Sequence, residues 1–155
     1  MNKPAVKFTL SNPIHFLALG FGSGLSPKAP GTFGTLAAVP VFLLFSLFTP
    51  LFYSIAVLIV CLAGIYICGK TAEDVGVHDH GAIVWDEIVG YLITMFLIPI
   101  SWQSVVVGFI LFRLFDIFKP WPISYIDKHI HGGFGIMFDD VIAGLMALGC
   151  MHLIF

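Results

Sequence analysis

Charged side chains are what this sequence most lacks. Asp, Glu, Lys and Arg make up 10% of the 155 residues and hydrophobic residues 59%, whereas about one quarter of an ordinary soluble domain is charged. This composition excludes a typical soluble globular domain, and the abundance of apolar residues also excludes intrinsic disorder. We therefore expect residues 1–155 to form a single membrane domain.

The sequence also lacks a strong positive charge and a paired cysteine pattern. Nine acidic residues against seven basic ones give a formal charge of −2, which disfavours nucleic acid as a partner. The three cysteines, Cys61, Cys68 and Cys150, lie in apolar stretches without paired spacing. Neither a disulfide framework nor a zinc knuckle is therefore indicated.

The longest charge-free interval separates Lys28 from Lys70 and contains 41 residues. One helix of that length would reach about 60 Å, roughly twice the hydrocarbon thickness of a bilayer. We therefore predict that the chain folds back at Thr49-Pro50, with one helix over about residues 35–48 and another over 51–68.

A second charge-free interval covers residues 88–112 and forms either one span or a helical hairpin. Pro99 disfavours a continuous helix, so the hairpin is the preferred interpretation. It would bring Asp86 and Asp116 to the same membrane face, whereas a single span would place them on opposite faces. The last apolar run, residues 141–155, predicts a further short helix.

These intervals predict an all-α fold, a compact polytopic membrane protein with about four to five short apolar helices. The polar loops would cluster on one face, because the turns opposite contain no charged residue. All seven basic residues lie at or beside that face, and the positive-inside rule places it in the cytoplasm.

Five carboxylates border the predicted apolar helices. Ionised carboxylates in such surroundings are costly unless they are paired or bind a metal. Acidic residues at helix starts are also stabilised by the helix dipole, so Asp86 and Asp139 could equally be structural caps. Together the five supply the hard oxygen ligands that Mg²⁺ prefers. We predict a Mg²⁺ site formed from Asp86, Glu87, Asp116, Asp139 and Asp140.

Two cations stand among these carboxylates. Arg113 and Asp116 are three residues apart and share a helix face, and Lys119 follows shortly after. Arg113 and Lys119 could form simple salt bridges or neutralise the oxygens of a phosphate group. The sequence leaves both interpretations open.

Two further segments are rich in polar or small residues. Residues 20–35 contain many Gly, Ser, Thr and Pro, which suits an anion-binding loop, although a tight re-entrant turn is the commoner explanation. Residues 78–80 and 129–131 are His-x-His steps. For these histidines direct metal binding is the minority interpretation, beside proton transfer, phosphate contacts or loop hydrogen bonds.

Six segments together resemble the phosphatidylglycerophosphatase A family, and they occur in the order typical of that family. They are residues 19–27 (LGFGSGLSP), 30–34 (PGTFG), 77–81 (VHDHG), 84–87 (VWDE), 112–122 (FRLFDIFKPWP) and 132–140 (GGFGIMFDD). The resemblance covers nearly the whole chain, from about residue 11 to residue 148.

The resemblance implies an enzyme of the bacterial inner membrane with its active face in the cytoplasm. Such an enzyme is a Mg²⁺-dependent lipid phosphatase that hydrolyses phosphatidylglycerophosphate to phosphatidylglycerol and inorganic phosphate. Its partners would be this lipid and the bilayer, while the oligomeric state is not indicated.

The expected roles follow from this resemblance together with the charge pattern. The expected catalytic residues are Asp79, Asp86, Asp116 and Asp139, and the expected phosphate-binding residues are Ser23, Arg113, Lys119 and His131. Metal-activated water would attack the phosphoryl group, and a phosphorylated aspartate remains the alternative.

Two other functions are compatible with carboxylates bordering membrane helices. A membrane alcohol-phosphate transferase would carry an Asp-Gly-x₂-Ala-Arg-x₈-Gly-x₃-Asp-x₃-Asp signature, which this sequence lacks. A transporter or ion-handling subunit would need no catalysis. Phosphate release from a lipid monoester distinguishes a phosphatase from both.

Overall fold

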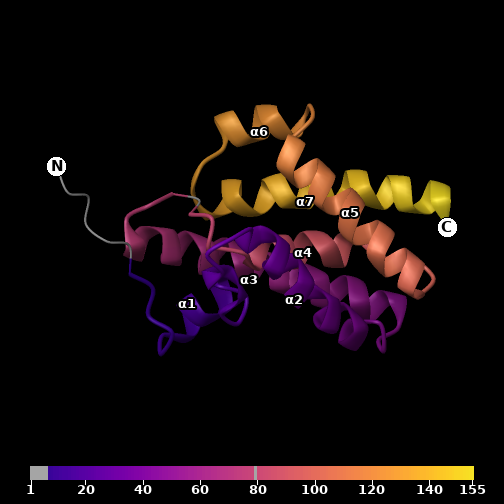
Figure 1. Ribbon diagram of the computed structural model, residues 1–155, viewed down its shortest axis with the longest axis horizontal. Coiled ribbons are helices and arrows are strands. Elements are labelled where there is room, and N and C mark those ends of the chain that lie inside the picture. Colours follow the sequence, from indigo (N-terminus) through magenta and orange to yellow (C-terminus); the bar gives the residue numbers. More distant parts are fainter. Residues whose placement is uncertain (1–6, 79) are drawn as a thin grey trace.

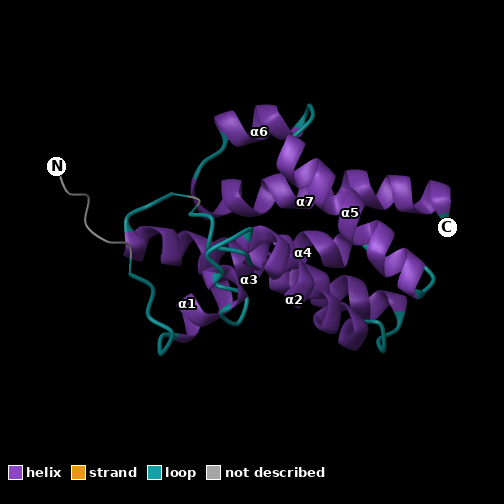
Figure 2. Cartoon of the chain, viewed as in Figure 1, coloured by secondary structure: helices purple, strands orange, loops and turns teal. Residues whose placement is uncertain are grey.

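The fold is a bundle of helices, seen here in a computed structural model that describes residues 7–78 and 80–155. Every regular element in this part of the chain is helical (Figure 2), which confirms the predicted all-α class. Five apolar helices and two short ones are joined by turns. The elements are α1 (Pro13–Ala18), the 3₁₀ helix η1 (Ser23–Leu25), α2 (Pro30–Phe45), α3 (Pro50–Val75), α4 (Trp85–Thr94), α5 (Trp102–Phe118), α6 (Ile123–His129) and α7 (Gly132–Ile154).

Helices α4 and α7 form the centre of the bundle. In Figure 1, α7 runs along the long axis of the molecule, with α6 beside its N-terminal half. Helix α4 packs on α7 more extensively than any other pair of elements, α3 and α5 both pack on α7, and α2 covers α4. The side chains of α4 therefore meet neighbours on all sides.

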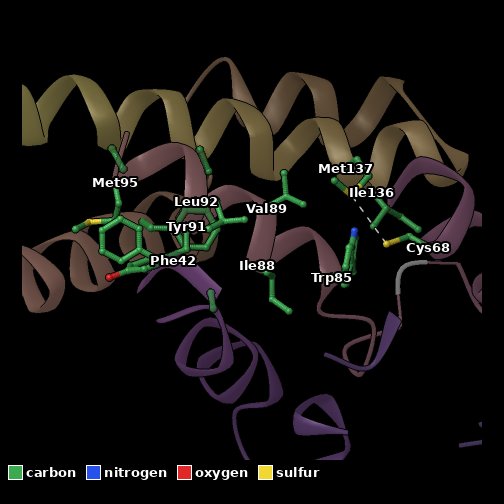
Figure 3. Close-up of a cluster of buried hydrophobic side chains, with 14 of the residues drawn as sticks. Phe42, Cys68, Trp85, Ile88, Val89, Tyr91, Leu92, Met95, Ile136 and Met137 are labelled. Atoms are coloured by element: carbon green, nitrogen blue, oxygen red, sulfur yellow. Dashed lines mark hydrogen bonds between the residues drawn. The ribbon is translucent and has the colours of Figure 1, made fainter. Parts of the chain in front are cut away.

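The hydrophobic core is built around α4. Figure 3 shows Ile88, Val89 and Leu92 of this helix among the buried side chains, with Phe42 of α2 beside Tyr91. The two rings meet edge to face with centroids 6.0 Å apart, a favourable arrangement for aromatic pairs. This packing holds the short α4 in place.

Two glycines allow α4 and α7 to cross closely. A methyl group added at Gly144 would lie 2.6 Å from the backbone oxygen of Gly90, and one added at Gly90 would lie 3.0 Å from the backbone oxygen of Asp140. Such distances leave no room for a side chain at either position. The crossing therefore brings Asp140 directly against α4.

Both predicted chain reversals are confirmed. Helix α3 begins at Pro50, with Thr49 as its cap, and the second interval is divided into α4 and α5. A capping box starts α5, in which the Ser101 hydroxyl accepts the Ser104 N–H at 3.0 Å and Ser104 reciprocates at 2.9 Å. Such a reciprocal cap satisfies two backbone donors at the helix start.

The start of the last helix was wrongly predicted. Asp139 and Asp140 do not open this helix, because α7 already begins at Gly132 and both residues lie within it. A methyl group at Gly133 would lie 3.0 Å from the backbone nitrogen of Gly69, so close packing on α3 stabilises this glycine-rich turn as helix. Capping of the helix dipole therefore does not explain Asp139.

Helices α3 and α7 are long and apolar enough to cross a membrane, and α3 in particular presents apolar side chains outward. The turns at residues 46–49 and 95–101 contain no charged residue, and Phe48 and Leu97 line one shared pocket at that end. The outward-facing apolar residues of α3 include Leu51, Phe52, Ile55, Leu58, Ile59 and Leu62.

Candidate active site

The start of α4 brings two carboxylates into the bundle. Asp86 and Glu87 occupy the first helical turn, after a backbone hydrogen bond from the Val84 N–H to the Ala18 carbonyl at 2.8 Å. The Asp86 side chain accepts the N–H of Glu87 at 3.0 Å. Asp86 is buried, and the Glu87 side chain is 12% exposed. Both carboxylates therefore have little water around them.

A third carboxylate joins them from α7. Asp86, Glu87 and Asp140 each offer an oxygen within 4.8 Å of the other two, and we call this group the carboxylate cluster. Oε2 of Glu87 and Oδ2 of Asp140 are buried and have no hydrogen-bond partner among the described residues. Like charges with unsatisfied oxygens are costly in such surroundings. Their donor chemistry fits a hard divalent cation.

Arg113 links α5 to this cluster. Its Nη1 forms an ion pair with Asp116, one turn further along the helix, and lies 3.9 Å from Oε1 of Glu87. The side chains of Arg113 and Asp116 are largely buried. The salt-bridge interpretation is thus realised for this pair, while the buried Nε of Arg113 has no partner in the described part of the chain.

Lys119 occupies the other side of the site. It ends α5 in the left-handed conformation, with φ of 48°, and its Nζ lies 3.6 Å from Asp127 and 3.9 Å from Asp139. Burial lowers the pKa of Lys119, but the surrounding carboxylates outweigh this effect and raise it. Lys119 therefore stays charged.

Asp127 was missed by sequence reasoning. It lies in the short helix α6 and does not border one of the long apolar runs. The pattern of carboxylates beside apolar runs therefore did not point to it. His15, a buried residue of α1, was not predicted as a site residue either, and its Nε2 lies 2.9 Å from Asp74 of α3. This second pair joins two helices away from the carboxylate cluster.

The predicted phosphate-binding residues Ser23 and His131 are not placed in the cluster. The Ser23 hydroxyl donates to the Gly20 carbonyl at 2.7 Å and so stabilises its own turn. His131 caps α7 and is exposed, with its ring 5.8 Å from that of His78. It precedes Asp139 by more than two helical turns, or about 12 Å along the axis. Asp79 lies outside the described residues.

The five predicted metal ligands lie near one another, and the Asp116 carboxylate interacts with those of Glu87 and Asp140. Asp86, Glu87 and Asp140 form the carboxylate cluster, whereas Asp116 is paired with Arg113 and Asp139 lies beside Lys119. Hard anionic oxygens and two partly buried cations occupy neighbouring positions. Such an arrangement can bind a divalent cation together with an anionic group such as phosphate.

Comparison with known proteins agrees with this chemistry. The profile of the family described as phosphatidylglycerophosphatase A matches residues 16–155. A phosphatidylglycerophosphatase A of Escherichia coli is 49% identical over 149 residues, covering 96% of this chain and 87% of that protein. A phosphatidylglycerophosphatase A of Haemophilus influenzae is 51% identical over 149 residues, which cover 95% of this chain and 91% of that protein.

A further relative carries a different name. A protein of Bacteroides thetaiotaomicron is 40% identical over 137 residues, which cover 83% of this chain and 85% of that protein. That protein is provisionally named a phosphatidylinositol-3-phosphatase. No solved structure matches the chain significantly. Because the profile covers nearly the whole sequence and two full-length relatives share about half of their residues with it, the chain belongs to the phosphatidylglycerophosphatase A family.

Proposed function

We propose that this protein is a Mg²⁺-dependent phosphatase that hydrolyses phosphatidylglycerophosphate to phosphatidylglycerol and inorganic phosphate. The relatives named phosphatidylglycerophosphatase A support the substrate. The carboxylate cluster is the single structural observation that carries the mechanism, because its three oxygens converge within 4.8 Å and a divalent cation would offset their repulsion.

Asp86, Glu87 and Asp140 would hold the metal. Carboxylates alone suit Mg²⁺ better than softer ions, which prefer His or Cys ligands. A Mg²⁺ ion held by these residues would supply Lewis acidity toward the phosphoryl group and a water molecule. Asp116 and Asp139, predicted as further ligands and catalytic residues, are assigned here to positioning Arg113 and Lys119, because these are the cations they contact.

Arg113 and Lys119 would bind the monoester phosphate. The guanidinium offers a flat, directional set of donors, and its buried Nε is available. The ammonium group of Lys119 supplies a second positive charge. Partial burial strengthens its electrostatic attraction to a phosphate group. Both side chains would neutralise charge on the phosphoryl oxygens during the reaction.

The reaction itself joins a water oxygen to phosphorus and breaks the bond between phosphorus and the glycerol oxygen. The attacking water gives up a proton and the leaving glycerol oxygen takes one up, and we assign this transfer to Asp79. His78 of the loop of residues 77–81 accepts the N–H of Gly132 at 2.9 Å, which joins this loop to α7. A phosphorylated aspartate trapped after brief exposure to substrate would contradict direct attack by water.

We place the protein in the bacterial inner membrane, with the carboxylate cluster reached from the cytoplasm. Helices α3 and α7 support membrane insertion, and the distribution of basic residues supports the orientation.

The test is phosphate release from phosphatidylglycerophosphate in mixed micelles by purified protein, with Mg²⁺ or with EDTA, and with a water-soluble monoester for comparison. We expect Mg²⁺-dependent release that is selective for the lipid. Folded protein that releases no phosphate with any divalent cation would contradict the proposal and favour transport. Incorporation of an added alcohol into lipid would instead indicate a transferase.

A further inference from the structure

The first turn of α2 lies directly against the active-site arginine. Gly31, the second residue of this helix, is buried, and a methyl group added there would lie 2.8 Å from Nη1, 2.9 Å from Nη2 and 3.1 Å from Cζ of Arg113. All three atoms belong to the guanidinium group. The motif of residues 30–34 therefore contacts the site, although none of its side chains has a role in the proposed chemistry.

The same guanidinium also contacts carboxylates. Arg113 pairs with Asp116 and lies 3.9 Å from Glu87. A helix N-terminus carries partial positive charge and does not attract a cation, so the approach of Arg113 to α2 depends on the carboxylates and on free space at Gly31. Any side chain at position 31 would occupy that space.

We propose that Gly31 is a positioning residue of the active site, because its missing side chain lets the Arg113 guanidinium lie against α2 while it faces Glu87 and Asp116. This inference rests on the proposed function, in which Arg113 binds the monoester phosphate. Gly31 itself touches no substrate in this scheme. It acts only by setting where the guanidinium lies.

Alanine at position 31 separates this role from a role in folding. Gly31 has no positive φ, and alanine is a better helix former than glycine, so the substitution suits the backbone of α2. The atoms that it would meet belong to the end of a flexible side chain. The helix should therefore stay in place while the guanidinium moves.

Chemical labelling tests the position of the guanidinium without any need for activity. Arg113 is the only arginine in the chain, so phenylglyoxal modification followed by mass spectrometry reports on this residue alone. We expect Gly31→Ala to be modified several times faster than the wild type, because the displaced guanidinium loses part of its cover and its pairing. Gly149→Ala is the matched control, since nothing lies within 4 Å of the added methyl group. Equal rates in all three proteins would overturn the proposal.

Kinetics with phosphatidylglycerophosphate provide the second test. We expect Gly31→Ala to lower kcat/KM about tenfold, the effect of weakening one charge-assisted contact, with an unchanged melting temperature. Arg113→Lys should lower kcat/KM by a similar factor. The double variant should have nearly the same kcat/KM as either single variant, because lysine has no planar guanidinium for the methyl group at position 31 to displace.

The outcomes separate this inference from the proposed function. Independent effects that multiply to about a hundredfold loss in the double variant would contradict the positioning role. A lower melting temperature of Gly31→Ala, with an unchanged rate of phenylglyoxal labelling, would show a structural role instead. Absence of turnover in the wild type would count against the proposed function, while the labelling rates would still decide the role of Gly31.

Discussion

Asp139 and Asp140 are neighbours in α7, and both of their carboxylates attract Lys119. Asp140 belongs to the carboxylate cluster with Asp86 and Glu87, whereas Oδ2 of Asp139 lies 3.9 Å from Nζ of Lys119. Successive side chains of an α-helix point about 100° apart. One turn of α7 therefore contributes both to the proposed metal site and to the placement of a proposed phosphate-binding lysine.

This divergence predicts that the two aspartates differ in their effect on metal affinity. Asp140→Asn should weaken Mg²⁺ binding by more than about tenfold, because it removes a proposed ligand. Asp139→Asn, the matched control, should keep most of the affinity and lose turnover through Lys119. Isothermal titration of each purified variant measures this difference. Equal losses of affinity in both variants would favour the original set of five ligands.

Mg²⁺ should stabilise the folded protein against heat. A ligand at about one hundred times its Kd adds about 2.7 kcal/mol to the free energy of unfolding. The melting temperature in detergent should therefore rise with Mg²⁺ and fall with EDTA. Asp140→Asn should show no such rise, and a full rise in this variant would place the metal elsewhere.

Without metal, Asp140→Asn should be more stable than the wild type. The substitution removes one of three carboxylates whose oxygens lie within 4.8 Å of one another, and relief of this repulsion should add about 1 kcal/mol to the free energy of unfolding. Melting curves recorded in EDTA test the sign. A lower melting temperature would show that Asp140 stabilises the fold even without a cation.

Lys119 should contribute to substrate binding over a wide pH range. Lys119→Ala should raise KM about tenfold, and Lys119→Arg should retain more affinity because it keeps the charge. The neighbouring carboxylates raise the pKa of Lys119 above its ordinary 10.5, so the charged form persists at lower pH and is lost only above that value. The ratio of KM between Lys119→Ala and the wild type should accordingly stay constant from neutral pH to about pH 9. A ratio that falls toward one over this range would show that Lys119 titrates earlier.

The glycine crossing of α4 and α7 predicts a stability effect. Gly144→Ala would place a methyl group 2.6 Å from the Gly90 carbonyl oxygen, and this overlap with backbone should cost about 1–3 kcal/mol of unfolding free energy. Gly149→Ala lies in the same helix with open space around it. It should be neutral or stabilising by up to about 1 kcal/mol. Denaturation in detergent compares the two, and equal stabilities would argue against tight packing at the crossing.

The orientation in the membrane can be tested at the turn before α5. In a variant whose three native cysteines are replaced by alanine, Ser101→Cys should react with an impermeant thiol reagent only from the periplasmic side. A cysteine at Ser26 serves as the control and should react only from the cytoplasmic side. Cytoplasmic labelling of Ser101→Cys would contradict the hairpin orientation.

Sequence reasoning located the chain reversals because proline and capping residues act locally. Pro99 and Ser101 lie in the turn between α4 and α5, and Thr49 caps α3. The pairing of Arg113 with Asp116 was likewise accessible, since residues three apart share a helix face. These features depend on a few neighbouring residues.

Other features depend on contacts between distant segments and could not be derived. Residues 132–135 contain three glycines, a poor local signal for a helix, yet packing of Gly133 on α3 makes them the first turn of α7. Lys119 at the end of α5 lies near Asp127 of α6 and Asp139 of α7, which no local pattern could indicate. Such tertiary contacts override the local conformational preference of the residues. For this reason the predicted start of the last helix was wrong.

The hydrogen bond between Val84 and Ala18 also has a consequence for biosynthesis. It fixes the irregular backbone that leads into α4, and Gly24 packs so tightly on Ala82 that no side chain fits between them. Non-helical backbone is tolerated at membrane depth only where protein covers it. The ribosome releases Ala18 and Gly24 long before their partners, so these contacts can form only once residues 82–84 have been made. The entry to α4, and with it the position of Asp86 and Glu87, is therefore completed only after α3 has been synthesised.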